Sequence, residues 1–107
     1  MLSFKLEKGL KLIPPHMHGA IRRYLENGIV PGSFLTAVIC NQLKESFMFA
    51  DEENRKHMYQ WADFMYNYMP FDSQGSPEKF RAWVKAGGFA GIEEGYYDDS
   101  LEPKGES

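Results

Sequence analysis

Apolar residues recur every three or four positions over much of the chain, which is the spacing of one buried face of an α-helix. The first such segment follows two prolines and places Ile21, Tyr24 and Leu25 on one face. Gly28 is a natural end, because glycine reaches the left-handed conformation without steric cost. The pattern therefore predicts a helix over residues 15–27.

A second helix is predicted to begin near Ser33, a residue type that often caps helix N-termini. Its periodic positions are occupied by Phe34, Leu35, Val38, Ile39, Gln42, Leu43 and Phe47. This stripe is almost wholly apolar, so we expect one continuous helix at the centre of the fold.

A third helix is predicted to follow Asp51, which can cap it, while two glutamates in its first turn complement the helix dipole. Pro70 ends the segment, because proline cannot continue a helix. The face of this helix is formed by Met58, Trp61, Phe64, Met65 and Tyr68.

The stretch GSPEKFRAWVKAGG, residues 75–88, predicts a fourth helix and allows two interpretations of its start. Ser76 can cap the helix, Pro77 suits its first position, and Gly87 supplies a left-handed end. Alternatively, the N–H groups at Gly75 and Ser76 could hold a phosphate or carboxylate. Capping is favoured, since each residue type already has a structural reason to be present and no Walker-type motif occurs.

These elements predict a compact all-α domain of about four helices over residues 17–89. The 107 residues are enough for one domain and too few for two. Residues 1–16 are expected to form an N-terminal arm, and loose alternation of apolar residues there allows either a hairpin or an extended segment. Residues 90–107 are expected to form a flexible acidic tail.

Charge is distributed unevenly between the domain and this tail. Residues 1–89 contain eleven Lys and Arg against nine Asp and Glu, a net +2, whereas residues 90–107 contain six acids and one lysine, a net −5. A balance of +2 is a weak electrostatic footprint, so direct nucleic-acid binding is not expected. One cysteine excludes an intramolecular disulfide, and no membrane-spanning run occurs, which is typical of a cytoplasmic protein.

Few residues are candidates for chemistry. His16 and His18 begin a helix, where their side chains diverge, and no further ligands follow at metal-site spacing. Cys40 lies on the apolar second helix, which favours a buried, inert thiol. Asp63 is either exposed or paired with an arginine, and exposure is favoured. No nucleophile–base or carboxylate pair stands out, so no catalytic residue, metal or cofactor is predicted.

Aromatic and methionine residues are unusually dense between residues 47 and 71. One helix face cannot bury all of them, so we expect an exposed apolar patch that includes Tyr59, Tyr66 and Met69. Such patches mark partner sites, subunit contacts in a homo-oligomer or ligand grooves.

The runs MHGAIRRYLENGIVPGSFLTAVICNQLKESF, ADEEN, FMYNYMP and GSPEKFRAW resemble a family of short proteins encoded by phages and prophages. The resemblance covers residues 17–86 and implies a viral accessory protein, without an established activity to transfer. Members often carry Cys-Trp where this chain has Ser73-Gln74, and Asn-Asp where it has Asn41-Gln42.

Two function classes follow. The leading hypothesis is a non-enzymatic phage accessory protein that binds and modulates a host protein, such as a defence or regulatory component. The alternative is an oligomeric binder of signalling nucleotides. In that case Arg22, Arg23 and the Gly75–Ser76 helix start would contact phosphate, and Tyr24 or Tyr66 would stack on a base.

Overall fold

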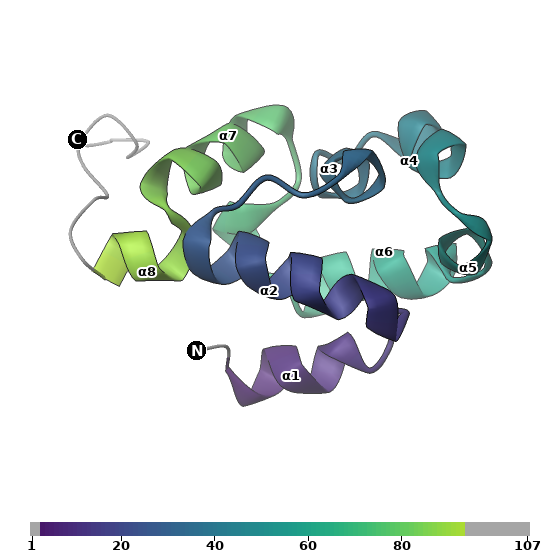
Figure 1. Ribbon diagram of the computed structural model, residues 1–107, viewed down its shortest axis with the longest axis horizontal. Helices are drawn as coiled ribbons and strands as arrows, with labels where there is room; N and C mark the ends of the chain where they lie inside the picture. Colours follow the sequence, from purple (N-terminus) through teal and green to yellow (C-terminus); the bar gives the residue numbers. More distant parts are fainter. Residues whose placement is uncertain (1–2, 94–107) are drawn as a thin grey trace.

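The computed structural model describes residues 3–93, and this part of the chain contains α-helices and short 3₁₀ turns but no strand (Figure 1). The all-α class is therefore confirmed. None of these helices has the length and apolarity needed to span a membrane. The elements are α1 Phe4–Leu10, η1 Pro15–Met17, α2 His18–Asn27, α3 Ser33–Ile39, α4 Leu43–Phe49, α5 Glu52–Lys56, α6 Met58–Asn67, η2 Phe71–Ser73, α7 Pro77–Ala86 and α8 Gly88–Glu93.

The predicted number of about four helices is wrong, because the described residues form eight α-helices. Two of the predicted helices are each divided in two. The second breaks between α3 and α4, where Asn41 takes a left-handed φ of 63° and the Gln42 N–H donates to the Ala37 carbonyl at 2.9 Å. The third breaks at His57, whose backbone leaves the helical region. Asparagine adopts the left-handed conformation more readily than most non-glycine residues, which permits the first break.

Residues 4–10 of the N-terminal arm form α1, in place of the hairpin or extended segment that was expected. Ser3 caps α1 by accepting the Leu6 N–H at 3.2 Å, and Leu6 and Leu10 are buried. Gly9 lies within α1 and makes a close packing contact. A Cβ at this position would lie 2.5 Å from Cγ of Tyr68.

The core lies between α2, α3, α6 and α7, and two buried indoles fix its geometry. Trp61 on α6 packs edge-on against Phe34 and donates its Nε1–H to Oδ1 of Asn54 at 3.0 Å. Trp83 on α7 donates its Nε1–H to the Tyr24 carbonyl of α2 at 2.9 Å. The faces predicted for the first and third helices are confirmed by the burial of Ile21, Tyr24, Leu25, Trp61, Phe64 and Met65.

The boundary between α7 and α8 depends on close backbone approach. Gly87 ends α7 with φ 82°, as predicted, and Gly88 follows with φ 67°. A Cβ on Gly88 would lie 2.6 Å from the Leu25 carbonyl oxygen, so this turn packs directly on the end of α2. Helix α8 extends into residues 90–93, which had been assigned to the tail. The remaining predicted tail, residues 94–107, lies outside the described residues.

Candidate functional site: a groove between α4 and α6

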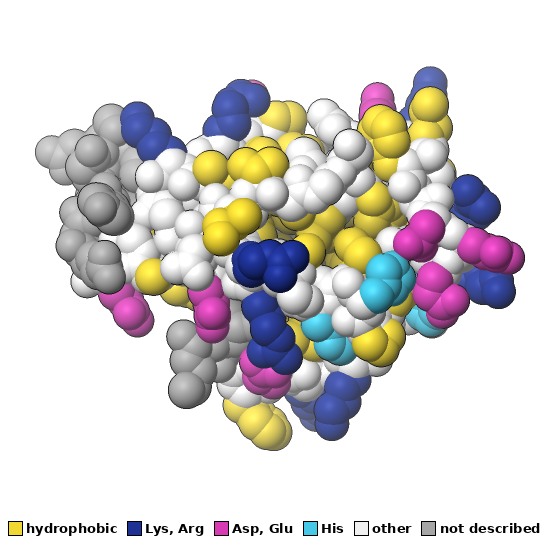
Figure 2. Space-filling view, in the orientation of Figure 1, with side chains coloured by type: hydrophobic (Ala, Val, Ile, Leu, Met, Phe, Trp, Pro, Cys, Tyr) yellow, Lys and Arg dark blue, Asp and Glu magenta, His cyan; other side chains and the backbone are white. Residues whose placement is uncertain are grey.

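Helix α4 exposes most of its apolar residues. Its one buried residue is Ser46, whose hydroxyl donates to the Gln42 carbonyl at 2.7 Å. Leu43 is 70% exposed and Met48 74%, and Phe47 and Phe49 are exposed as well. Figure 2 shows apolar side chains on the surface in the region of α4. The predicted position at the centre of the fold is thus correct for α3 and wrong for α4.

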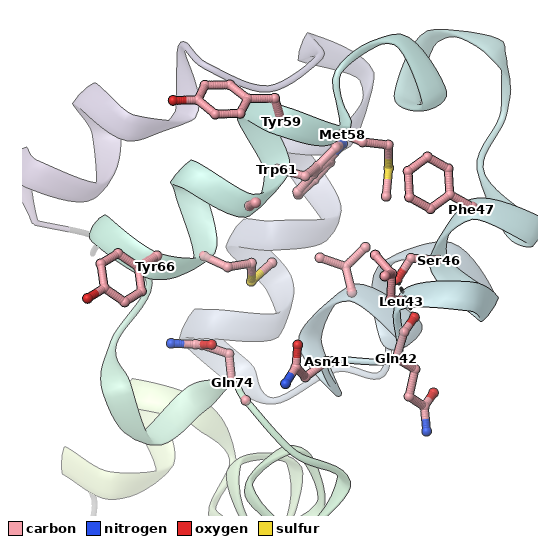
Figure 3. Close-up of a pocket in the computed structure, with 14 residues that line it drawn as sticks. Asn41, Gln42, Leu43, Ser46, Phe47, Met58, Tyr59, Trp61, Tyr66 and Gln74 are labelled. Carbon is pink, nitrogen blue, oxygen red and sulfur yellow. Dashed lines mark hydrogen bonds between the residues drawn. The ribbon is translucent and has the colours of Figure 1, made fainter.

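A groove of about 620 Å³ lies between α3–α4 on one side and α6 on the other (Figure 3). This volume falls within the usual range of ligand sites, roughly 300–1,000 Å³. Among residues 3–93, no Asp, Glu, Lys, Arg or His lines it. We call it the α4–α6 groove, and its lining consists of Val38, Asn41, Gln42, Leu43, Ser46, Phe47, Met58, Tyr59, Trp61, Ala62, Met65, Tyr66, Gln74 and Gly75.

Polar groups gather at one edge of the groove. Asn41 and Gln74 project from this edge, opposite Met58 and Tyr59, while the side chain of Gln42 extends away from the centre (Figure 3). Within the described part of the chain, the side-chain amides of these three residues have no hydrogen-bond partner. Their donors and acceptors are therefore available to a bound molecule.

The loop before α7 closes this edge. Gly75 has a φ of 115°, and its N–H donates to the Ile39 carbonyl at the end of α3 at 2.8 Å. Ser76 lies outside the groove lining and accepts the Lys79 N–H at 3.2 Å, so the predicted cap is confirmed. Of the two N–H groups that the alternative assigned to an anion, that of Gly75 already has a partner within the protein.

The apolar patch predicted from sequence is confirmed for two of its three residues. Tyr59 and Tyr66 are 80% and 87% exposed, and both line the groove. The expected exposure of Met69 is wrong, since this side chain is only 5% exposed. Helix α6 ends at Asn67, and the Met69 N–H returns to the Phe64 carbonyl at 3.1 Å, which turns the side chain inward.

The residues proposed to bind a nucleotide do not converge. Tyr24 is completely buried and donates its hydroxyl to the Ser73 carbonyl at 2.6 Å, so it cannot stack on a ligand at the surface. Burial also raises the pKa of this phenol well above its ordinary value. Arg22 forms a two-point ion pair with Glu7, and its hydrogen bond lowers the pKa of that carboxyl. Basic side chains lie over α2 in Figure 2, but neither Arg22 nor Arg23 lines the groove.

The other sequence candidates have local structural roles. His16 Nε2 lies 3.0 Å from Oδ2 of Asp51, and His18 Nε2 lies 3.1 Å from the Ile13 carbonyl. Residues 3–93 contain no cluster of three or more His, Cys, Asp or Glu that could hold a metal. Burial raises the pKa of the Cys40 thiol, which disfavours the thiolate. Asp63 is half-buried and accepts a hydrogen bond from Asn67 at 2.7 Å.

Several groove residues were not identified from the sequence. Asn41, Gln42 and Gln74 supply its amides, and Leu43 and Phe47 were assigned to the core. The available signal was the pair Asn41-Gln42, two consecutive amides within an otherwise apolar stripe. Such a pair is a plausible place for a helix to break.

A scan of protein-family models and searches of curated proteins and solved structures found no match to this chain.

Proposed function

We propose that this is a non-enzymatic phage accessory protein that acts in the bacterial cytoplasm by binding and modulating a host protein. The phage origin rests on the sequence resemblance. The binding role rests on one observation, the exposed apolar face of α4 beside an uncharged groove. The proposed target is a defence or regulatory component of the host.

The exposure of α4 is costly to the isolated chain. Leaving apolar surface in water forgoes roughly 25 cal/mol for every Å² that could have been buried. Leu43 and Phe47 leave much of their surface exposed, and they lie four residues apart on one face of the same helix. A contiguous apolar surface of this kind is characteristic of an interaction site.

The composition of the groove also supports a protein partner. Aromatic residues and methionine are enriched at the centres of protein interfaces, whereas charged residues are depleted. The aromatic and methionine side chains include Phe47, Met58, Tyr59 and Tyr66, and none of the lining residues that the structure describes is charged. The groove thus resembles the core of an interface more than an ordinary polar surface.

The alternative, an oligomeric binder of signalling nucleotides, has less support. The groove volume and the exposed rings of Tyr59 and Tyr66 favour it. A nucleotide phosphate, however, is usually held by charged or N–H donors, and no Lys or Arg of the described part of the chain lines the groove. The buried Tyr24 and the paired Arg22 weaken it further.

Quantitative co-purification from bacterial cells tests this proposal. Tagged wild-type protein is compared with a Tyr59→Ala/Tyr66→Ala variant and with Phe4→Ala, which removes an exposed ring on α1 outside the groove. We expect a host protein to be enriched by the wild type and by Phe4→Ala and lost from the double variant, with all three proteins equally stable. A retained nucleotide in native mass spectrometry, without a groove-dependent protein partner, would contradict the proposal and support the alternative.

A further inference from the structure

We infer that the segment bound in the α4–α6 groove is an amphipathic α-helix of the partner, uncharged on the face that it docks. This inference rests on the proposed function and specifies the chemistry of the partner. It follows from three properties of the groove: an apolar floor, a matching length along α6 and an uncharged lining with amides at one edge.

The floor of the groove is apolar and binds the backbone of an extended peptide poorly. Val38, Met58 and Met65 are apolar, and the indole N–H of Trp61 is already donated to Asn54. An extended segment lying there would bury backbone N–H and C=O groups without partners, which is costly. A helix satisfies these groups internally and presents only side chains to the floor. The apolar floor therefore selects a helix.

The length of the groove matches the spacing of anchors on one helix face. Tyr59 and Tyr66 are seven residues apart on α6, a rise of about 10.5 Å. Opposite them, α4 contributes Leu43 and Phe47 from consecutive turns. A partner helix between α4 and α6 would place large apolar anchors at i, i+3 or i+4, and i+7, which span the same rise. The bound segment is therefore about two to three turns long.

The absence of charge in the described lining further restricts which side chains the docked face of the partner can carry. Because the described residues contribute no charged side chain to the lining, a charged side chain on the docked face would be desolvated without a counter-ion from them. The amides of Asn41 and Gln74 lie at one edge, and within the described residues their donors and acceptors have no hydrogen-bond partner. Helix termini carry backbone groups without intrahelical partners, and these amides can bind them. We therefore place one end of the partner helix at the Asn41–Gln74 edge.

The probe for this inference is a displayed library of random peptides of about 16 residues, long enough for a helix to form on binding. Selection uses the full-length protein, and selected peptides are then titrated by calorimetry. Ala62→Glu adds a charge to the groove at an exposed helical position, and Gln60→Glu adds the same charge to α6 outside the lining.

We expect selected peptides to carry apolar anchors at i, i+3 or i+4, and i+7 and to gain helical circular dichroism when bound. A central proline should lower their affinity about tenfold or more, since it breaks the helix. Ala62→Glu should lower it by a similar, roughly tenfold factor through an unpaired charge, and Gln60→Glu should change it less than about twofold.

Other outcomes would overturn the inference in distinguishable ways. Peptides that require the groove but tolerate a central proline would be extended, which contradicts the helix and leaves the proposed function intact. Peptides bound equally by wild type and Ala62→Glu, or a library without groove-dependent binders, would contradict the groove as a peptide site. A wild-type dimer that Ala62→Glu dissociates would identify a second copy of the chain as the occupant.

Discussion

Helices α4 and α7 are both short and amphipathic in sequence, but α7 buries its apolar face within the domain whereas α4 leaves its apolar residues exposed. Helix α7 buries Trp83 and Ala86, is capped by Ser76 and Gly87, and is tied to α2 by a buried indole hydrogen bond. Helix α4 has no side-chain cap at its N-terminus and buries only Ser46. Its apolar residues remain at the surface.

This difference separates residues that stabilise the fold from residues that remain available for binding. Each periodic position of α7 has a partner within the domain, so stability alone accounts for it. Leu43 and Met48 on α4 have no comparable partner, so stability does not account for their apolar character. The comparison assigns folding to the α2–α7 side and binding to the α4–α6 groove.

The largest expected effect is on the α7 side. Trp83→Ala should destabilise the domain by about 3–5 kcal/mol, because it removes a buried ring and leaves a cavity. It also leaves the Tyr24 carbonyl without its indole donor. Urea denaturation monitored by circular dichroism measures this loss. Wild-type stability in the variant would show that the α2–α7 contact is not part of the stable core.

A smaller effect is expected from the hydroxyl of Tyr24. Tyr24→Phe keeps the ring and removes the hydrogen bond to the buried Ser73 carbonyl, at a cost of about 1–3 kcal/mol. Thermal unfolding of the two proteins gives the difference. Partner binding should be unchanged when compared at a temperature where both are folded, since Tyr24 lies outside the groove lining.

Removing the α7 cap should have a moderate effect confined to stability. Ser76→Ala eliminates the acceptor of the Lys79 N–H and should cost about 1 kcal/mol. Calorimetric titration of the partner should give the wild-type affinity. If a folded Ser76→Ala protein lost binding about tenfold or more, the start of α7 would be an anion site in addition to a cap.

The smallest effect on stability is expected on α4 itself. Leu43→Ala changes a residue that is 70% exposed, so the free energy of unfolding should change by less than about 0.5 kcal/mol. Partner affinity should nevertheless fall, because Leu43 lines the groove. A large loss of stability would place Leu43 with the core residues and remove the contrast between the two helices.

The parts of the fold that follow local rules were predictable from the sequence. Ser76 and Asp51 cap their helices as expected, because the capping hydrogen bond joins residues only three positions apart. The buried faces of α2, α6 and α7 follow from the helical period. These features need no knowledge of the tertiary structure.

Features that depend on tertiary contacts were not predictable. The stripe from Phe34 to Phe47 is consistent with one helix, and it does not reveal that Asn41 turns the chain out of it. In the sequence, Gly9 resembles a turn residue, because its close contact with Tyr68 is apparent only in the folded structure. Among the candidate site residues, Tyr59 and Tyr66 were identified through an excess of aromatic residues. The amides of the groove, however, require α3, α6 and the loop before α7 to be brought together.

The central claim is that the α4–α6 groove binds a partner and that its exposed side chains contribute little to folding. The affinity of the captured host protein for wild type, Ala62→Glu and Gln60→Glu, measured together with their thermal midpoints, tests it most directly. We predict that Ala62→Glu lowers affinity about tenfold or more through an unpaired charge in the groove, while its midpoint and the affinity of Gln60→Glu stay close to wild type. Equal affinities for the wild type and a fully folded Ala62→Glu protein would contradict the claim.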